Sequence, residues 1–292
     1  MVLASAATTW NLEPLQIVPT LLVSVLYLRR TRTLARKGLP VPKYRQFLFW
    51  LGIFLVVMAL NSPIDELGEK DFFFVHMGQH VILGDLAPLC FVAGLTGPVL
   101  RPVLALKPVD RLRFLTHPLV ALPVWAVNLY LWHLPVLYQA ALHHNSVHAL
   151  EHFLMFSCGC LMWSPVLETL PAPEWFGTAW KLGYIVVVRF VETILGNVFI
   201  WSSTVFYSTY DHAGSIWGIS PVHDQNLAGV VMMVEGGFVT LGALAWLFLR
   251  LAEEGELKQE LIEAGYDPAQ VARAVRYGRA KTLAQTPAGA PR

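Results

Sequence analysis

Residues 72–84 read FFFVHMGQHVILG, an apolar run that contains two histidines, His76 and His80. The run extends to about residue 95, which is the length that an α-helix needs to cross the roughly 30 Å hydrocarbon core of a bilayer. Ionisable side chains are costly within a membrane span, and they commonly mark a site or a pathway there. The stretch therefore predicts a membrane helix that carries a functional site.

The composition of the whole chain also indicates a protein that lies in a lipid bilayer. Hydrophobic residues make up 55% of the 292 residues and charged residues only 14%, whereas a soluble domain has about 25% charged residues. Apolar runs predict seven transmembrane helices, over residues 12–28, 46–60, 72–95, 118–141, 147–170, 181–205 and 226–250. We expect an all-α polytopic membrane protein, with a seven-helix bundle in residues 1–252 and a cytoplasmic tail in residues 253–292.

Basic residues predict the orientation of this bundle, because short cytoplasmic loops retain lysine and arginine. All 21 of these residues except Lys70 and Arg189 fall in the tail or in the connections on one side. The N-terminus is therefore expected outside and the C-terminus in the cytoplasm. The first apolar segment has no basic residue before it, which predicts a retained helix and not a cleaved signal peptide.

This orientation places every histidine except His117 towards the outer side. His76 and His80 are four residues apart, as are His148 and His152, so each pair lies on one helical face. His133 lies in the outward half of the fourth span. Neutral imidazole is a good ligand for copper, zinc, iron and nickel, so the five histidines are candidate ligands of a metal or a haem. The alternative is that they only make hydrogen bonds between helices.

Other polar residues are candidates to complete the site or to bind helices together. Asp224 precedes the seventh span, and it is expected to be a metal ligand, an acceptor that orients a ligand, or the N-cap of its own helix. Arg189 and Glu192 are three apart and predict an ion pair. Asp85 and Glu235 have no partner nearby in the sequence. The three cysteines lie in spans and predict no disulfide.

Four motifs carry a resemblance to a known family. HMGQH at residues 76–80 is followed by WHLPVLYQAALHH, HALEHFLMF and SPVHDQNLAGVVMM, in that order. Together they resemble the CtaG family, bacterial membrane proteins that act as assembly factors for caa-type cytochrome c oxidase. The resemblance implies seven helices, copper handling, and functional roles for His76, His80, His133, His148, His152, Asp224 and Gln225. The chain departs from the family pattern after HMGQH, where Asp85 appears and Leu89 replaces a proline.

The leading hypothesis is a non-enzymatic assembly factor of a bacterial plasma membrane that binds copper, as copper(I), near the outer face. Its expected ligands are His76, His80, His148 and His152, with His133 and Asp224. Expected partners are oxidase subunits and membrane lipid, and no nucleic acid; homo-oligomers are left open. The alternatives are a zinc-dependent intramembrane hydrolase, a b-type haem protein and a metal-free assembly scaffold.

Overall fold

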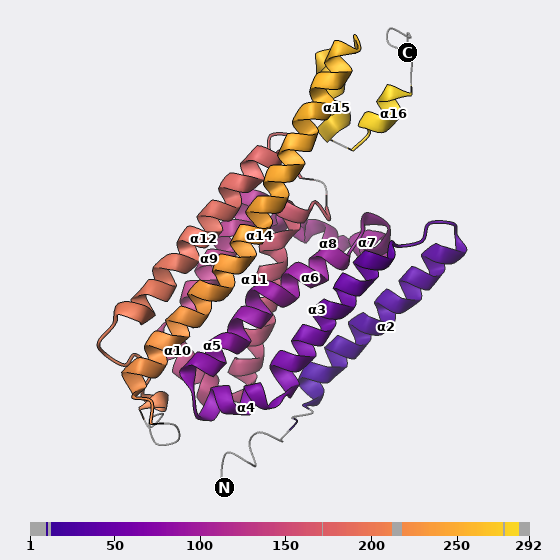
Figure 1. The fold of residues 1–292 in the computed structure, drawn as a ribbon. Helices are drawn as coiled ribbons and strands as arrows, with labels where there is room; N and C mark the ends of the chain where they lie inside the picture. The colour runs from indigo at the N-terminus through magenta and orange to yellow at the C-terminus, as the bar shows by residue number, and fades with distance from the viewer. Residues whose placement is uncertain (1–9, 11–12, 171, 212–217, 277, 286–292) are drawn as a thin grey trace. The chain divides into compact units, whose positions relative to one another are not determined.

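The computed structural model describes residue 10 and residues 13–170, 172–211, 218–276 and 278–285 (Figure 1). Every regular element within these residues is a helix. The expected all-α class is therefore confirmed for the described part of the chain. His212, one of the histidines expected in an outer loop, lies outside the described residues, and so do the first and last residues of the chain.

The helices follow one another with short connections, many of them starting at a proline. Proline suits the first helical turn because it has a fixed φ and lacks the N–H that would have no partner there. The elements are α2 (Pro14–Arg36), α3 (Lys43–Asn61), α4 (Pro63–Lys70), α5 (Phe73–Val81), η1 (Ile82–Leu86), α6 (Ala87–Gly94), α7 (Gly97–Leu104), α8 (Lys107–Arg111), η2 (Leu112–Thr116), α9 (Pro118–Trp132), α10 (Pro135–His143), α11 (Asn145–Leu167), α12 (Thr178–Trp201), η3 (Ser208–Tyr210), α14 (Pro221–Glu263), α15 (Pro268–Arg276) and α16 (Ala280–Ala284).

The chain divides into two compact units. The first comprises residues 1–172 and 188–237, and the second comprises residues 173–187 and 238–292. Helices α12 and α14 each contribute to both. Helix α14 runs without a break through residue 252, where we expected the membrane domain to end, so the predicted tail begins within a helix.

Several helices are long and apolar enough to cross a membrane. Among the described residues these are α3, the continuous segment Phe73–Gly94, α11, α12 and α14, and a sixth span is possible if the bent pair Lys107–Thr116 and Pro118–Trp132 is counted as one. Together they indicate a membrane protein. The expected number of seven spans, and the orientation of the termini, stay predictions.

The fourth predicted span, residues 118–141, is not one helix. Helix α9 ends at Trp132 and α10 begins at Pro135. The residue before a proline is pushed out of the α-helical region, and Leu134 accordingly has a ψ of 131°. The break leaves His133 at the end of α9, where its side chain enters the interior of the first unit and is 7% exposed.

The third predicted span is one continuous helical segment with an irregular turn. Helices α5 and α6 are joined by η1, a π-helical turn, and turns of this kind are frequent near functional sites. Glycines let neighbouring helices approach the segment closely: a Cβ on Gly52 of α3 would lie 2.7 Å from the backbone nitrogen of Phe91, and one on Gly159 of α11 would overlap the carbonyl oxygen of Gly84. Helices α3 and α11 therefore pack directly against this segment.

The second unit has its own small core. Leu261, Val271 and Ala280 are buried together. Arg276 donates hydrogen bonds to the carbonyls of Pro173 and Phe176, at 3.2 and 2.7 Å. The described residues after 252 thus belong mainly to helices, up to the end of α16.

Candidate metal site

Five histidines gather in the first unit from three segments of the chain. His76 and His80 come from α5, His148 and His152 from α11, and His133 from the end of α9. The ring centroids of His76 and His80 are 4.3 Å apart, and those of His148 and His152 are 4.0 Å apart. Across the helices, His80 lies 5.8 Å from His152 and 6.0 Å from His133, centroid to centroid. We call these five residues the histidine cluster.

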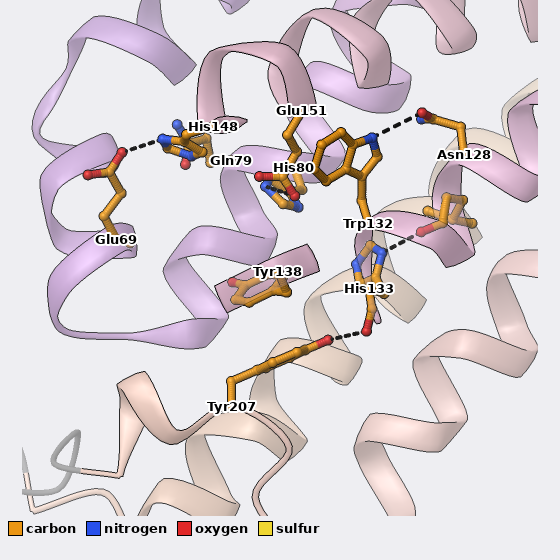
Figure 2. A network of polar contacts seen from close by, with 12 residues as sticks. Glu69, Gln79, His80, Asn128, Trp132, His133, Tyr138, His148, Glu151 and Tyr207 are labelled. Carbon is orange, nitrogen blue, oxygen red and sulfur yellow. Dashed lines mark hydrogen bonds and ion pairs between the residues drawn. The ribbon is translucent and has the colours of Figure 1, made fainter. Parts of the chain in front are cut away.

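The cluster is closed off from solvent. The five side chains are between 0% and 7% exposed. Tyr138 packs beside it, 5.4 Å from His76 between ring centroids, and stacks on Tyr207 at 4.0 Å (Figure 2). The hydroxyl group of Tyr207 donates a hydrogen bond of 2.8 Å to the carbonyl of His133, which fixes the backbone at the break between α9 and α10.

Two of the histidines are oriented by a hydrogen bond from Nδ1. In His133, Nδ1 lies 2.7 Å from the carbonyl oxygen of Leu129, and a carbonyl only accepts, so Nδ1 is the donor. In His148, Nδ1 lies 2.7 Å from Oε1 of Glu69 (Figure 2). Protonation at Nδ1 leaves the lone pair on Nε2, which is the arrangement by which outer groups orient metal-binding histidines.

The remaining ring nitrogens of the cluster have no hydrogen-bond partner in the described part of the chain. These are Nε2 of His133 and His148 and both nitrogens of His76, His80 and His152. A buried polar atom without a partner costs roughly 1–3 kcal/mol, and native proteins hold few of them. Each neutral imidazole offers one lone pair, and five such rings in one buried place fit a bound cation, whose ligand bonds would offset this cost.

Glu151 completes the cluster and adds an oxygen donor. It is fully buried, both of its carboxylate oxygens lack hydrogen-bond partners, and Oε1 is 3.8 Å from Nε2 of His80 (Figure 2). One donor atom each from His76, His80 and Glu151 lie within 4.8 Å of one another, close enough to share one ion.

We did not include Glu151 among the predicted ligands, because adjacent residues on a helix point about 100° apart. The signal that would have found it is its spacing from His148. Residues 148, 151 and 152 are related by three and four positions, which places them on one broad helical face.

Asp224 lies outside the histidine cluster. Its two oxygens accept hydrogen bonds from the backbone nitrogens of Phe73 and Phe74, at 2.9 and 3.1 Å. Asp224 therefore caps the N-terminus of α5, the helix that carries His76 and His80. It is not the N-cap of its own helix, and its contribution is to the position of α5.

A cavity of about 50 Å³ lies next to the cluster. His80 and His133 line it on one side, and the thioethers of Met77, Met155 and Met232 add soft sulfur atoms to its wall. Acidic side chains line it as well: Asp85, Glu192 and Glu235.

Of the acidic residues beside this cavity, Asp85 connects two helical segments, and Glu192 forms an ion pair within α12. Asp85 accepts a hydrogen bond of 2.6 Å from Nε1 of Trp163, so it binds η1 to α11. The ion pair expected between Arg189 and Glu192 is present, with a nitrogen–oxygen distance of 3.8 Å.

Comparison with known proteins assigns the chain to a family. The model of the cytochrome c oxidase caa3 assembly factor family, Caa3_CtaG, matches residues 25–254, most of the chain. The chain belongs to this family. The match includes all five histidines of the cluster and Glu151, and it confirms the resemblance seen in the sequence motifs. No curated protein and no solved structure matches the chain.

Membership of Caa3_CtaG makes the chain an assembly factor of cytochrome c oxidase, and an oxidase is its partner in general terms. Its apolar helices are consistent with a factor that works in a bacterial membrane.

Proposed function

We propose that the chain binds copper as cargo in the histidine cluster and takes part in supplying it to cytochrome c oxidase. The observation that carries this proposal is the convergence of buried ring nitrogens that lack hydrogen-bond partners, together with the carboxylate of Glu151, whose oxygens also accept no hydrogen bond from the described residues. Structural histidines that only join helices would have their nitrogens in hydrogen bonds, as Nδ1 of His133 does.

The choice of copper over other metals rests on the family role and on the donor atoms. Cytochrome c oxidase is a copper enzyme, so its assembly requires this ion. Imidazole binds copper well, and soft thioether sulfur is suited to copper(I). The three methionines along the adjacent cavity therefore favour copper(I) as the form that is carried.

Delivery to the oxidase requires the copper ion to leave the histidine cluster again. His76, His80 and Glu151 form a compact donor set, and His133, His148 and His152 lie near enough to exchange with them as ligands. Such a set lets an ion move between neighbouring donors without being released into lipid. We propose delivery as a transfer from this set and no catalysis by the chain itself.

The test is metal content of detergent-purified protein, measured by mass spectrometry after anaerobic loading with copper(I). The wild type is expected to retain copper, and the variant His76→Leu/His80→Leu is expected to lose it. The matched control is His143→Ala/His144→Ala, which removes two exposed histidines outside the cluster and should keep full copper content. Far-ultraviolet circular dichroism establishes that each variant is folded.

The same preparations separate the other possible functions. Two histidines and a glutamate are also the donor set of many hydrolytic zinc sites, so retained zinc in place of copper, with turnover of an amide or ester lipid, would favour an intramembrane hydrolase. A haem protein would show visible absorption bands. Folded wild type that holds no metal would identify a scaffold and overturn the copper proposal.

A further inference from the structure

A second cavity of about 50 Å³ lies beside the histidine cluster, between α4 and the start of α11. Three carboxylates line it, those of Glu13, Asp65 and Glu69, together with the amide of Asn145 and the imidazole of His148. We call this cavity the acidic vestibule. His148 is the only one of its described lining residues that is able to carry a positive charge.

The charges of Glu69 and Glu13 act electrostatically on the carboxyl group of Asp65. The pKa of Asp65 is raised from 3.8 to about 6, mainly by burial and next by the charge of Glu69, with a smaller contribution from Glu13. These carboxylates outnumber the single positive charge that His148 is able to carry, and excess negative charge in a cleft with low-dielectric walls attracts cations and raises their local concentration.

His148 is shared between the acidic vestibule and the histidine cluster. Its Nδ1 is bonded to Glu69 of the vestibule (Figure 2). Its buried Nε2 has no hydrogen-bond partner among the described residues, and its ring centroid lies 4.0 Å from that of His152 and 5.7 Å from that of His76. One side chain therefore separates the vestibule from the donor atoms of the cluster.

Two further contacts fix the vestibule against the cluster. A Cβ on Gly68 of α4 would lie 2.9 Å from the Cα of His76, so the glycine lets α4 lie directly on the helix of the cluster. Gln79, which lies between His76 and His80 in the sequence and is fully buried, donates a hydrogen bond of 2.6 Å to Asp65. The vestibule is thus held in one place relative to the histidines.

We propose that the acidic vestibule is the site through which the metal cation reaches and leaves the histidine cluster, with His148 as its first nitrogen ligand. This inference rests on the proposed function, because it takes the cluster to be the binding site. It assigns to Glu13, Asp65 and Glu69 the attraction of a soft monovalent cation before it meets the buried donors. Removing their charge then slows loading without changing how many ions are finally bound.

The experiment is stopped-flow loading of the detergent-purified full chain with copper(I), and with silver(I) as a redox-inert probe. The variant Glu13→Gln/Asp65→Asn keeps the shape of the cavity and leaves Glu69, the partner of His148, in place. Its loading rate is expected to fall by about ten-fold at low salt and to depend less on ionic strength than that of the wild type. The control Glu253→Gln/Glu256→Gln removes two exposed charges elsewhere and should load at the wild-type rate.

The outcomes distinguish the two proposals. Full final stoichiometry with slow loading supports the vestibule. Full stoichiometry with a loading rate equal to that of the control overturns the proposed role of the vestibule but not the proposed metal site. A wild type that binds neither copper(I) nor silver(I) overturns both proposals. The single variant Glu13→Lys changes a residue that makes no side-chain cap of α2, and its reversed charge should slow loading further than Glu13→Gln does.

Discussion

Replacing Glu151 by leucine should change stability and metal affinity in opposite directions. In the protein without metal, the fully buried Glu151 has no hydrogen bond on either carboxylate oxygen. Leucine removes this uncompensated polar group, so the free energy of unfolding of the metal-free protein should rise by about 1–3 kcal/mol. If the side chain of Glu151 instead stabilised the metal-free protein through its packing, the substitution would lower the free energy of unfolding.

The effect on binding follows from the donor set. Glu151 supplies one of the three donor atoms that lie within 4.8 Å of one another. Loss of an outer orienting group already costs roughly 10–100-fold in metal affinity, so loss of a direct ligand should cost at least about 10-fold. Copper at 100 times the wild-type dissociation constant would stabilise the wild type by about 2.7 kcal/mol, and the variant by only about 1.4 kcal/mol.

The assay is unfolding in a titration with sodium dodecyl sulfate, with a chelator and then with copper(I). Glu151→Leu should be more stable than the wild type in chelator and should gain less from copper. Glu256→Leu, the same substitution at an exposed position of α14, should leave the copper-induced gain unchanged. A Glu151→Leu protein that is less stable in chelator and gains as much from copper as the wild type would refute the reasoning.

Three further predictions concern residues around the site. Asp224→Asn retains one acceptor for the N-terminus of α5, so it should lower the free energy of unfolding by about 1–3 kcal/mol in the same titration, with unchanged copper content at saturation. Gly159→Ala should destabilise by about 1–3 kcal/mol because its Cβ meets the backbone of η1, whereas Gly183→Ala, with open space around it, should be neutral or slightly stabilising. The pKa of Asp65 is raised from 3.8 to about 6, so the folded state binds more protons than the unfolded state between these pH values. The contribution of Asp65 to the free energy of unfolding should be fully present below about pH 4 and should be lost, by up to about 3 kcal/mol, as pH rises through 6. Subtracting the pH profile of Asp65→Asn from that of the wild type isolates this contribution.

The sequence identified the members of the histidine cluster because their signal is local. The pairs His76/His80 and His148/His152 are four apart, and helical geometry alone puts each pair on one face. Proline also gives local information: the break at Pro135 that ends the fourth predicted helix early was readable in the residues 132–135.

The rest of the site depends on packing between distant segments. Asp224 and Phe73 are 151 positions apart, and Glu69 meets His148 only because α4 lies against α5. No spacing rule joins such residues, so the capping role of Asp224 and the pairing of Glu69 were not predicted. Glu151 is an intermediate case. Its spacing from His148 in the sequence places both residues on one helical face, but only the structure shows that Glu151 is buried.

The π-helical turn η1 has a consequence for how this chain tolerates changes in length. A π-turn accommodates one more residue than a regular α-helical turn, so deleting one residue from Ile82–Leu86 would yield an unbroken α-helix. Because the π-turn takes up this extra residue locally, the half that carries His80 and the half that packs on Gly52 would keep nearly their present orientation. The same deletion within α5 or α6 would instead rotate one half against the other by about 100°. The turn Ile82–Leu86 is therefore the part of this segment where the loss of one residue would leave the histidines facing α11.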